Sequence, residues 1–234
     1  MTPVTINQRW TLLLPEHRDR GEWWDNWEKE RLASMSDQLT PLLGEVVYYA
    51  GAEQGDMPAL LTSWGCDTVL VEPVARVWPN MRAIYEANNL KDPLACFVGF
   101  AGAADRGNPG IDEGWPPEAS GDVTDVEGFA NLWERDDLPI IALDSLPDAG
   151  IDPPSAISID VEGSELEVLR GATGCLLLHR PLVWVSIHPT FMADLYDQHP
   201  DEIFSLMARH GYRGRMLADL HESHWLFWPE EYPR

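Results

Sequence analysis

The stretch VVYYAGAEQGDMPALLTSW, residues 46–64, decides the fold class. It opens with a short β-rich run over Val46–Ala50, turns at Gly51–Asp56 and ends in a helical pattern that reaches Trp64. Glycines in the turn let the backbone fold tightly and approach a ligand closely, and the helix that follows presents free N–H groups there. The stretch therefore predicts a strand–turn–helix unit whose turn is a candidate binding site.

Strand and helix patterns continue to alternate after this unit. Apolar runs predict strands at Thr68–Val71, Ala95–Phe100, Ile140–Leu143, Ala156–Val161 and Leu182–Ile187, and a final antiparallel pair that reaches Phe227. Helical patterns cover Arg76–Asn88, Asp201–His210 and a stretch that a capping box at Ser164–Glu167 opens and Gly171 ends. Such alternation predicts an α/β fold, with one domain over residues 45–234 built on a mostly parallel seven-stranded sheet with helices on both faces.

Two segments depart from this rhythm. Residues 1–44 are expected to form an N-terminal helical extension, in which a helix over Gly21–Met35 carries a stripe of three tryptophans, at 23, 24 and 27. The stripe packs on the main sheet in one interpretation and forms a lid over a substrate in the other. Residues 104–138 are rich in glycine, proline and acid, which predicts an insertion with a short helix near Phe129–Trp133.

The composition limits the partners. The chain has 234 residues, and 39 acidic against 16 basic side chains leave a formal net charge of −23. A field this negative repels phosphate backbones and anionic lipids, so we expect no nucleic-acid or membrane partner and favour a small neutral or cationic molecule. No pattern sets an oligomeric state.

The same composition indicates a compartment. The cysteines at 66, 96 and 175 are odd in number and scattered, which argues against a disulfide framework and against a cysteine zinc site. No apolar run approaches the length of a membrane span, and residues 1–10 lack the features of a secretion signal. We therefore expect a soluble cytoplasmic protein.

The first candidate site combines the turn after Ala50 with an acid about 20 residues later. Glu72 closes the second strand, where a carboxylate can accept both hydroxyls of a ribose. The turn differs from a G-x-G-x-x-G dinucleotide motif because Glu53 replaces the middle glycine. An acidic turn suits a positively charged ligand better than a pyrophosphate, which disfavours a nicotinamide-dependent oxidoreductase.

The second candidate site follows the strand at residues 156–161. Asp160 and Glu162 alternate onto one side of the chain, so both carboxylates can face a crevice at the carboxyl end of the sheet. Paired acids there can take a proton from a hydroxyl or hold a divalent cation. Glu165 and Glu167 fall in the first turn of a helix, where acids stabilise the helix end.

Histidines mark the end of the chain. His188 follows the strand at 182–187 and is either a satisfied structural residue, a general base, or the third ligand of a metal site with Asp160 and Glu162. His221 and His224 flank the last strand pattern, and we expect them to be structural or to support the site.

Residues at both candidate sites resemble one family. The stretch ISIDVEGSELEVLRGA (Ile157–Ala172), preceded by ALDSL (Ala142–Leu146), resembles the signature of FkbM-type S-adenosylmethionine-dependent methyltransferases. The GAEQGD turn and VEP (Val71–Pro73) fall where that family keeps its cofactor loop and its ribose-binding acid. The resemblance covers roughly residues 45–211. It implies a Rossmann-like class I methyltransferase fold, S-adenosylmethionine as cofactor, and methyl transfer to a hydroxyl of a sugar, glycan or related small metabolite.

The resemblance also implies residue roles. Gly51, Ala52, Glu53, Gly55 and Asp56 would line the methionine part of the cofactor, Glu72 would bind its ribose, Phe100 and Ala101 would lie near adenine, and Asp160, Glu162 and His188 would lie beside the sulfonium. The family usually places an acid two positions before the first glycine, where this chain has Tyr49. Either Glu53 or Asp56 replaces that acid, or cofactor affinity is lowered.

Two hypotheses on mechanism stay open. Asp160 or His188 removes the acceptor proton as a general base, or a bound divalent metal lowers the pKa of the acceptor hydroxyl. The alternative class is a non-enzymatic interaction or assembly module that keeps the fold. The enzyme hypothesis depends on one geometric expectation: that the turn at 51, the acid at 72 and the carboxylates at 160 and 162 open onto one cavity.

Overall fold

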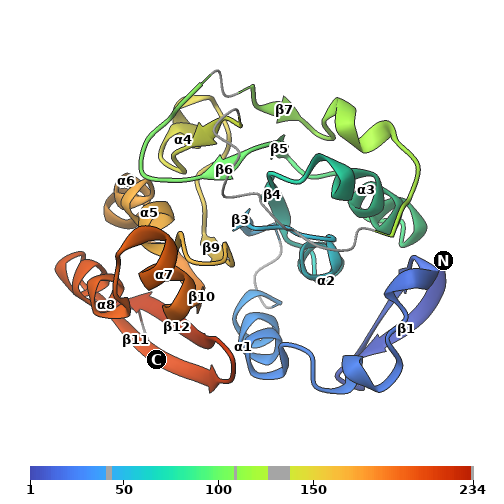
Figure 1. Ribbon diagram of the computed structural model, residues 1–234, viewed down its shortest axis with the longest axis horizontal. Helices are drawn as coiled ribbons and strands as arrows, with labels where there is room; N and C mark the ends of the chain where they lie inside the picture. Colours follow the sequence, from blue (N-terminus) through green and yellow to red (C-terminus); the bar gives the residue numbers. More distant parts are fainter. Residues whose placement is uncertain (41–43, 108–109, 126–137, 233–234) are drawn as a thin grey trace.

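A computed structural model describes residues 1–40, 44–107, 110–125 and 138–232 (Figure 1). Eight strands of the described part form one large sheet: β3 Val46–Ala50, β4 Asp67–Val71, β5 Ala95–Phe97, β7 Asp112–Glu113, β9 Ala156–Ile159, β10 Leu182–Ile187, β11 Tyr212–Asp219 and β12 Ser223–Pro229. Their order is β11-β12-β10-β9-β3-β4-β5-β7. Neighbours from β10 to β5 pair in parallel, whereas β12 pairs antiparallel with both β10 and β11, and β7 pairs antiparallel with β5. Seven of these strands correspond to predicted ones and the two-residue β7 is added at the edge, whereas the strand predicted at Ile140–Leu143 is not part of this sheet.

Helices cover both faces of the sheet because the central strands are apolar on both. All five residues of β3 are buried, and successive side chains point to opposite faces, so Val47 and Tyr49 pack in one core and Tyr48 and Ala50 in the other. One face of the sheet, the one with Val47 and Tyr49, carries α1 Lys29–Leu39, α2 Asp56–Ser63 and α3 Trp78–Ala87 (Figure 1). The opposite side carries α4 Ser145–Asp148, α5 Glu165–Arg170, α6 Thr173–Leu178, α7 Pro189–Tyr196 and α8 Pro200–Arg209.

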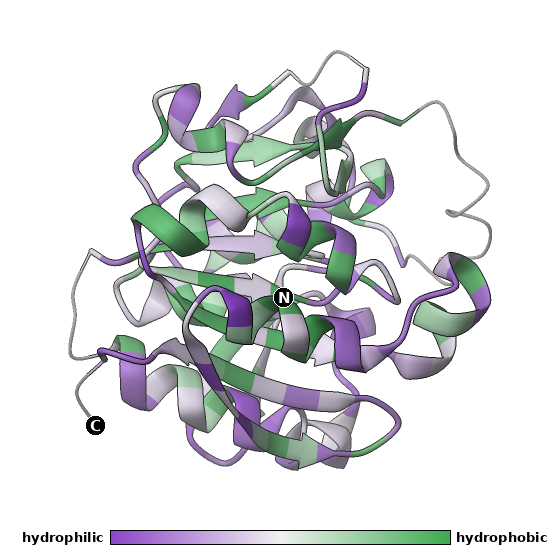
Figure 2. Cartoon of the chain, turned by 90° about the vertical axis from the view of Figure 1, so that its left-hand side faces the viewer, coloured by the Kyte–Doolittle hydropathy of each residue, from purple (hydrophilic) through white to green (hydrophobic). Residues whose placement is uncertain are grey.

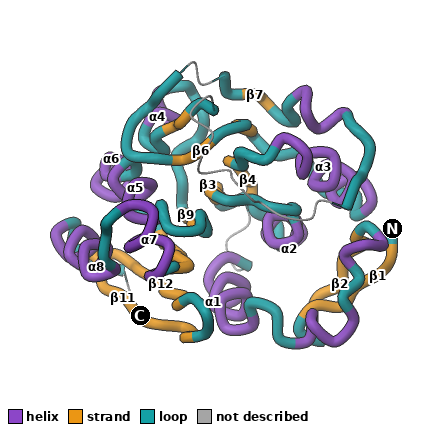
Figure 3. Tube along the Cα trace, viewed as in Figure 1, coloured by secondary structure: helices purple, strands orange, loops and turns teal. Residues whose placement is uncertain are grey.

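The N-terminal segment is only partly helical, which corrects the expectation for residues 1–44. It begins with an antiparallel hairpin, β1 Thr2–Ile6 and β2 Trp10–Leu14, and β2 packs against α2 and α3 (Figure 3). The helix expected over Gly21–Met35 is divided into a 3₁₀ helix, Gly21–Asp25, and α1. Glu28 has a left-handed backbone (φ 49°), which an α-helix does not accept.

The predicted third strand is also divided. Val98 and Gly99 separate β5 from β6 Phe100–Ala101, which pairs in parallel with β8 Ile140–Ile141 in a small sheet of its own. A Cβ on Gly99 would lie 2.5 Å from the carbonyl oxygen of Pro139, so this close approach requires a glycine. The short helix expected near Phe129–Trp133 lies outside the described residues.

Helix α5 begins where the sequence predicts, although the predicted capping box is wrong. The Ser164 hydroxyl donates to the carbonyl of Val161 and caps no helical N–H. The carboxylate of Glu165 accepts the backbone N–H of Gly163 instead, which ties the helix start to the loop before it. Local hydrogen bonds of this kind compete with the capping box for the same groups.

The connection pattern locates a crevice. From β3 the chain moves outward to β4 and β5 and then returns to β9 on the other side of β3, so the sheet has a topological switch point between β3 and β9. In open α/β sheets ligands bind outside the carboxyl ends of the strands at such a point. Figure 2 shows hydrophobic residues along the central strands and more hydrophilic ones on the β11–β12 hairpin at the edge of the sheet. None of the described helices combines the length and the hydropathy needed to cross a membrane.

Candidate functional site

The turn after β3 lies directly against the end of β9. Gly51 has a φ of +85°, and its N–H donates to the carbonyl of Val71 at 2.9 Å. A Cβ built on Gly51 would lie 1.7 Å from the carbonyl oxygen of Asp160. Only glycine permits both this backbone conformation and this approach, so Gly51 brings the two candidate sites together.

Replacing Gly51 with alanine should therefore lower the free energy of unfolding by at least ~2 kcal/mol, since left-handed strain and overpacking act together. Gly150 is the matched control because its φ is +92° and nothing lies within 4 Å of an added Cβ. Gly150→Ala should cost only about 1 kcal/mol, the strain alone. Urea denaturation followed by circular dichroism measures both, and equal losses would contradict the close approach.

Glu72 supports the turn from below. The side chain is buried, and its two carboxylate oxygens accept the backbone N–H groups of Glu53 and Val74, each at 2.8 Å. Burial raises the pKa of Glu72 to about 7, although the two N–H donors oppose the rise. Each oxygen keeps a lone pair, so the carboxylate can still accept hydroxyl groups of a ligand.

A cavity of about 660 Å³ lies over this edge of the sheet. Gly51, Glu72, Asp160 and Glu162 all line it, so the expected shared cavity is present. Glu53, assigned to the methionine part of the cofactor, and Phe100 and Ala101, assigned to the adenine, line the same cavity as the ribose-assigned Glu72. The volume lies within the ordinary range of small-molecule sites.

A second cavity of about 660 Å³ adjoins the first. The two share Gly51, Glu53, Asp160 and Glu162, and the second extends to the N-terminal segment and to the β11–β12 turn. Three of the residues expected to bind cofactor, Ala52, Gly55 and Asp56, border only this second cavity. The three tryptophans of the N-terminal segment play different parts. Trp24 is buried in the core, as the packing interpretation expects, whereas Trp23 and Trp27 line the second cavity, as the lid interpretation expects.

The position of the missing loop acid is buried. Tyr49 packs beneath the turn, and its hydroxyl lies 3.0 Å from the sulfur of Met57 and 3.5 Å from Nη2 of Arg31. Asp56 is also buried and forms an ion pair with Arg18. Glu53, in contrast, is exposed and faces both cavities, so it is the better placed of the two candidate replacements.

Arg31, on α1, is the buried centre of a polar network. Its side chain is 1% exposed, and Nη1 donates to Oδ2 of Asp160 at 2.6 Å, to Ser186 at 2.8 Å and to Oε2 of Glu28 at 3.2 Å. Nη2 donates to Ser158 at 2.9 Å. The guanidinium therefore fixes the Asp160 carboxylate from behind, and the side chain of Asp160 stays 19% exposed toward the cavities.

His188 is enclosed by carboxylates. Nδ1 lies 2.7 Å from Oε1 of Glu165 and Nε2 contacts Oε2 of Glu222, while Glu162 lies 3.5 Å away. Burial alone would lower the pKa of His188, but the hydrogen bonds to Glu165 and Glu222 raise it to about 11. With both ring nitrogens engaged, the imidazole has no free lone pair, which disfavours the general-base role and favours the structural one.

Glu162 is the accessible acid of the group. Its side chain is 45% exposed and lies on the wall that both cavities share. Burial and the Asp160 carboxylate raise the pKa of Glu162, against the opposing effect of His188. The two histidines near the C-terminus differ in exposure. His221 is exposed, whereas His224 is buried beside Ser186. Burial and the Arg31 charge lower the pKa of His224 to about 4.

Several site residues were missed in the sequence. Glu222 lies between His221 and His224 and has no pattern of its own that indicates a site. Glu28 and Arg31 lie in a helical pattern, where charged residues are usual. Ser158 and Ser186 carried a usable signal, because each is a lone polar residue inside an apolar strand. Buried polar groups need partners, so such serines indicate a polar network.

The strand order, the antiparallel β12 between β10 and β11, and the cavities at the carboxyl edge together define the class I Rossmann-like methyltransferase fold. The family model of the methyltransferase FkbM domain matches residues 46–213. The chain belongs to the FkbM methyltransferase family.

Solved structures agree on the fold. Methyltransferase FkbM from Methylobacillus flagellatus KT is 18% identical with a TM-score of 0.51, and the match covers 79% of this chain and 44% of that one. This chain thus spans less than half the length of that protein. Precorrin 8w decarboxylase from Methanobacterium thermoautotrophicum is 10% identical with a TM-score of 0.50, and the match covers 86% of this chain and 89% of that one. A comparison with curated proteins found no match.

Proposed function

We propose that this chain transfers a methyl group from S-adenosylmethionine to a hydroxyl of a sugar or related small metabolite. The observation that carries the proposal is the pair of cavities that meet at Gly51, Glu53, Asp160 and Glu162. Methyl transfer requires the donor sulfur and the acceptor oxygen to be aligned across the methyl group. The two cavities can hold the donor and the acceptor, one in each, with the methyl group at the residues where the cavities meet.

The first cavity suits the cofactor. Glu72 accepts the ribose hydroxyls with its remaining lone pairs, and Phe100 and Ala101 contact the adenine. Glu53 faces the ammonium group of the methionine part and takes the place of the family's loop acid. The acidic lining also complements the positive charge of the sulfonium.

The second cavity suits a small acceptor, which places Ala52, Gly55 and Asp56 beside the acceptor in this proposal and not beside the cofactor. Trp23 and Trp27 offer apolar surface on one wall, while the shared wall is acidic. Such a lining admits a polar, uncharged or cationic molecule and repels an anionic one. The proposal places the reaction in the cytoplasm, with no nucleic-acid partner.

Glu162 removes the acceptor proton in this proposal. The acceptor oxygen attacks the methyl carbon, the C–O bond forms as the S–C bond breaks, and the sulfonium becomes a neutral thioether. Glu162 accepts the hydroxyl proton because its carboxylate is exposed at the junction. Asp160, held by Arg31, positions the acceptor.

Binding of S-adenosylhomocysteine by calorimetry tests the cofactor assignment. Glu72→Gln should weaken binding by about tenfold or more, because charge-assisted hydrogen bonds to the ribose are lost. Wild-type affinity should rise with pH through about 7, the raised pKa of Glu72, since the ionised carboxylate is the acceptor. The exposed Glu86 supplies the control, and Glu86→Gln should bind as the wild type does.

The same calorimetry discriminates the alternatives. A wild-type protein that does not bind S-adenosylhomocysteine would overturn the enzyme proposal and favour an interaction module. Binding of NADH in its place would favour an oxidoreductase. A crystal soaked with S-adenosylhomocysteine then outlines the acceptor space beside the sulfur.

A further inference from the structure

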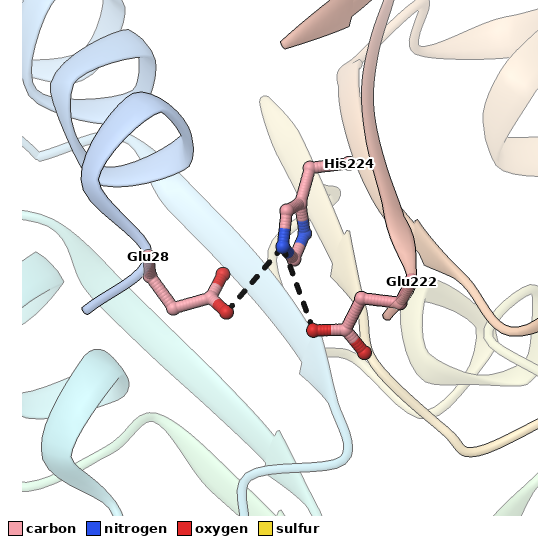
Figure 4. Close-up of side chains that lie close together, drawn as sticks. All are labelled: Glu28, Glu222 and His224. Atoms are coloured by element: carbon pink, nitrogen blue, oxygen red, sulfur yellow. Dashed lines mark ion pairs between the residues drawn. The ribbon is translucent and has the colours of Figure 1, made fainter. Parts of the chain in front are cut away.

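Three side chains from two distant parts of the chain, the segment before α1 and the start of β12, each direct one atom at a common point (Figure 4). Glu28 precedes α1, Glu222 lies in the turn before β12, and His224 lies in β12. Nε2 of His224 is 3.5 Å from Oε1 of Glu28 and 3.5 Å from Oε1 of Glu222. All three atoms lie within 4.8 Å of one another.

A second contact fixes each of these side chains through its other polar atom. Arg31 binds Oε2 of Glu28, His188 binds Oε2 of Glu222, and the hydroxyl of Ser186 lies 2.9 Å from Nδ1 of His224. Outer contacts of this kind orient the ligands of metal sites. The facing Oε1 of Glu222 also lies 3.4 Å from Nε2 of the exposed His221.

Ser186 anchors the His224 ring on one side, and the ring nitrogen on the other side, Nε2, is buried without a hydrogen-bond partner among the described residues. The Ser186 hydroxyl donates its single proton to Oδ2 of Asp160 at 3.2 Å and accepts from Arg31 at 2.8 Å. The same hydroxyl lies 2.9 Å from Nδ1 of His224, so the ring is held through Nδ1 while Nε2 faces the carboxylates of Glu28 and Glu222. His224 is 1% exposed, and Nε2 has no hydrogen-bond partner among the described residues.

A buried ring nitrogen that faces two carboxylates beyond hydrogen-bond distance is an unsatisfied polar group, and a cation between the three atoms would satisfy it. We propose that Glu28, Glu222 and His224 bind a divalent metal ion. One imidazole and two carboxylates form a mixed donor set that suits Mn²⁺ or Zn²⁺ better than a softer ion. Ligands about 2.1 Å from a tetrahedral centre lie about 3.4 Å apart, close to the 3.5 Å that separates Nε2 of His224 from each of the two carboxylates.

The neighbouring acids favour the same ion. Asp160, Glu162 and Glu165 add three carboxylates to those of Glu28 and Glu222, against the cationic Arg31 and His188. A second cluster, Asp160, His188 and Glu222, is also compact. It is the weaker candidate because both nitrogens of His188 already contact carboxylates.

The metal site opens toward the acceptor. Glu28 and Glu222 line the second cavity, so an open coordination position faces the space assigned to the acceptor. This step rests on the proposed function: the acceptor would be a compound that offers an oxygen to the metal ion. A divalent ion lowers the pKa of a bound hydroxyl, which makes proton transfer easier.

Mn²⁺ titration of the chelator-treated full-length chain, without cofactor, tests the site by calorimetry and electron paramagnetic resonance. The wild type should bind one Mn²⁺, and Glu28→Gln should weaken binding by about tenfold or more. Glu30, exposed on the same helix, is the matched control, and Glu30→Gln should bind as the wild type does. His224→Ala should also lose binding, whereas the exposed His179→Ala should not.

Circular dichroism of each variant separates lost ligands from lost folding, and Glu28→Gln decides the case if His224→Ala does not fold. Wild-type protein without an Mn²⁺ site would overturn the proposal. Loss of binding in Asp160→Asn but not in Glu28→Gln would overturn it as well, in favour of the second cluster. Failure of S-adenosylhomocysteine to bind, with Mn²⁺ binding intact, would overturn the proposed function alone.

Discussion

Replacing Arg31 with methionine should lower the free energy of unfolding by about 3–5 kcal/mol, the cost of removing one partner from a buried charge network. The guanidinium is 1% exposed and donates to Glu28, Asp160, Ser158 and Ser186. Methionine restores much of the volume, so the loss reports the polar contacts more than a cavity. Urea denaturation followed by tryptophan fluorescence measures the change.

Arg82 supplies the control for this experiment. It pairs with Glu86 on α3, and the two side chains are 39% and 61% exposed. Arg82→Met should cost no more than about 1 kcal/mol, because an exposed ion pair contributes little. Similar losses in the two variants would contradict the claim that Arg31 holds the network together.

Replacing Glu162 with glutamine should lower kcat on the order of 10²-fold or more, while the affinity for S-adenosylhomocysteine stays close to that of the wild type. Glutamine keeps the shape and can still accept hydrogen bonds, but it cannot take the acceptor proton. Single-turnover methyl transfer, followed by mass spectrometry of the methylated product, measures the chemical step.

Glu113→Gln is the control for Glu162, because Glu113 is an exposed carboxylate at the far edge of the sheet. Its kcat should match that of the wild type. If Glu162→Gln keeps its kcat while Asp160→Asn loses activity, the proton acceptor is Asp160 and the assignment made here is wrong.

Local patterns predicted the central elements well. Val46–Ala50 and Leu182–Ile187 form strands with the predicted bounds, because continuous apolar runs of this length are typical of parallel strands buried on both faces. The N-terminal hairpin was missed, although Asn7 and Gln8, both with positive φ, form a tight turn between its strands. The capping box failed because Glu165 binds the loop before the helix.

The arrangement of residues at the carboxyl edge of the sheet was predictable only in outline. The carboxyl ends of parallel strands meet at one edge of the sheet, so the sequence alone predicts that Glu72, Asp160 and Glu162 lie close together. Arg31 could not, because it lies 129 residues from Asp160 in a helix of the N-terminal segment. Only the packing of α1 against the sheet puts its guanidinium behind the Asp160 carboxylate.

By itself the sequence determined the alternation of strands and helices, the turn glycines, the strand-end acids and, through their resemblance to a family signature, the FkbM methyltransferase family. These are local properties, set by side-chain periodicity and backbone sterics within a few residues. The tertiary structure decided how accessible each acid is, since Arg31 holds Asp160, which is 19% exposed, and His188 contacts the buried Glu222, whereas Glu162, 3.5 Å from His188, stays 45% exposed. It also decided that Glu28, Glu222 and His224 converge, because charge and hydrogen bonding depend on distances in space that the order of residues does not encode.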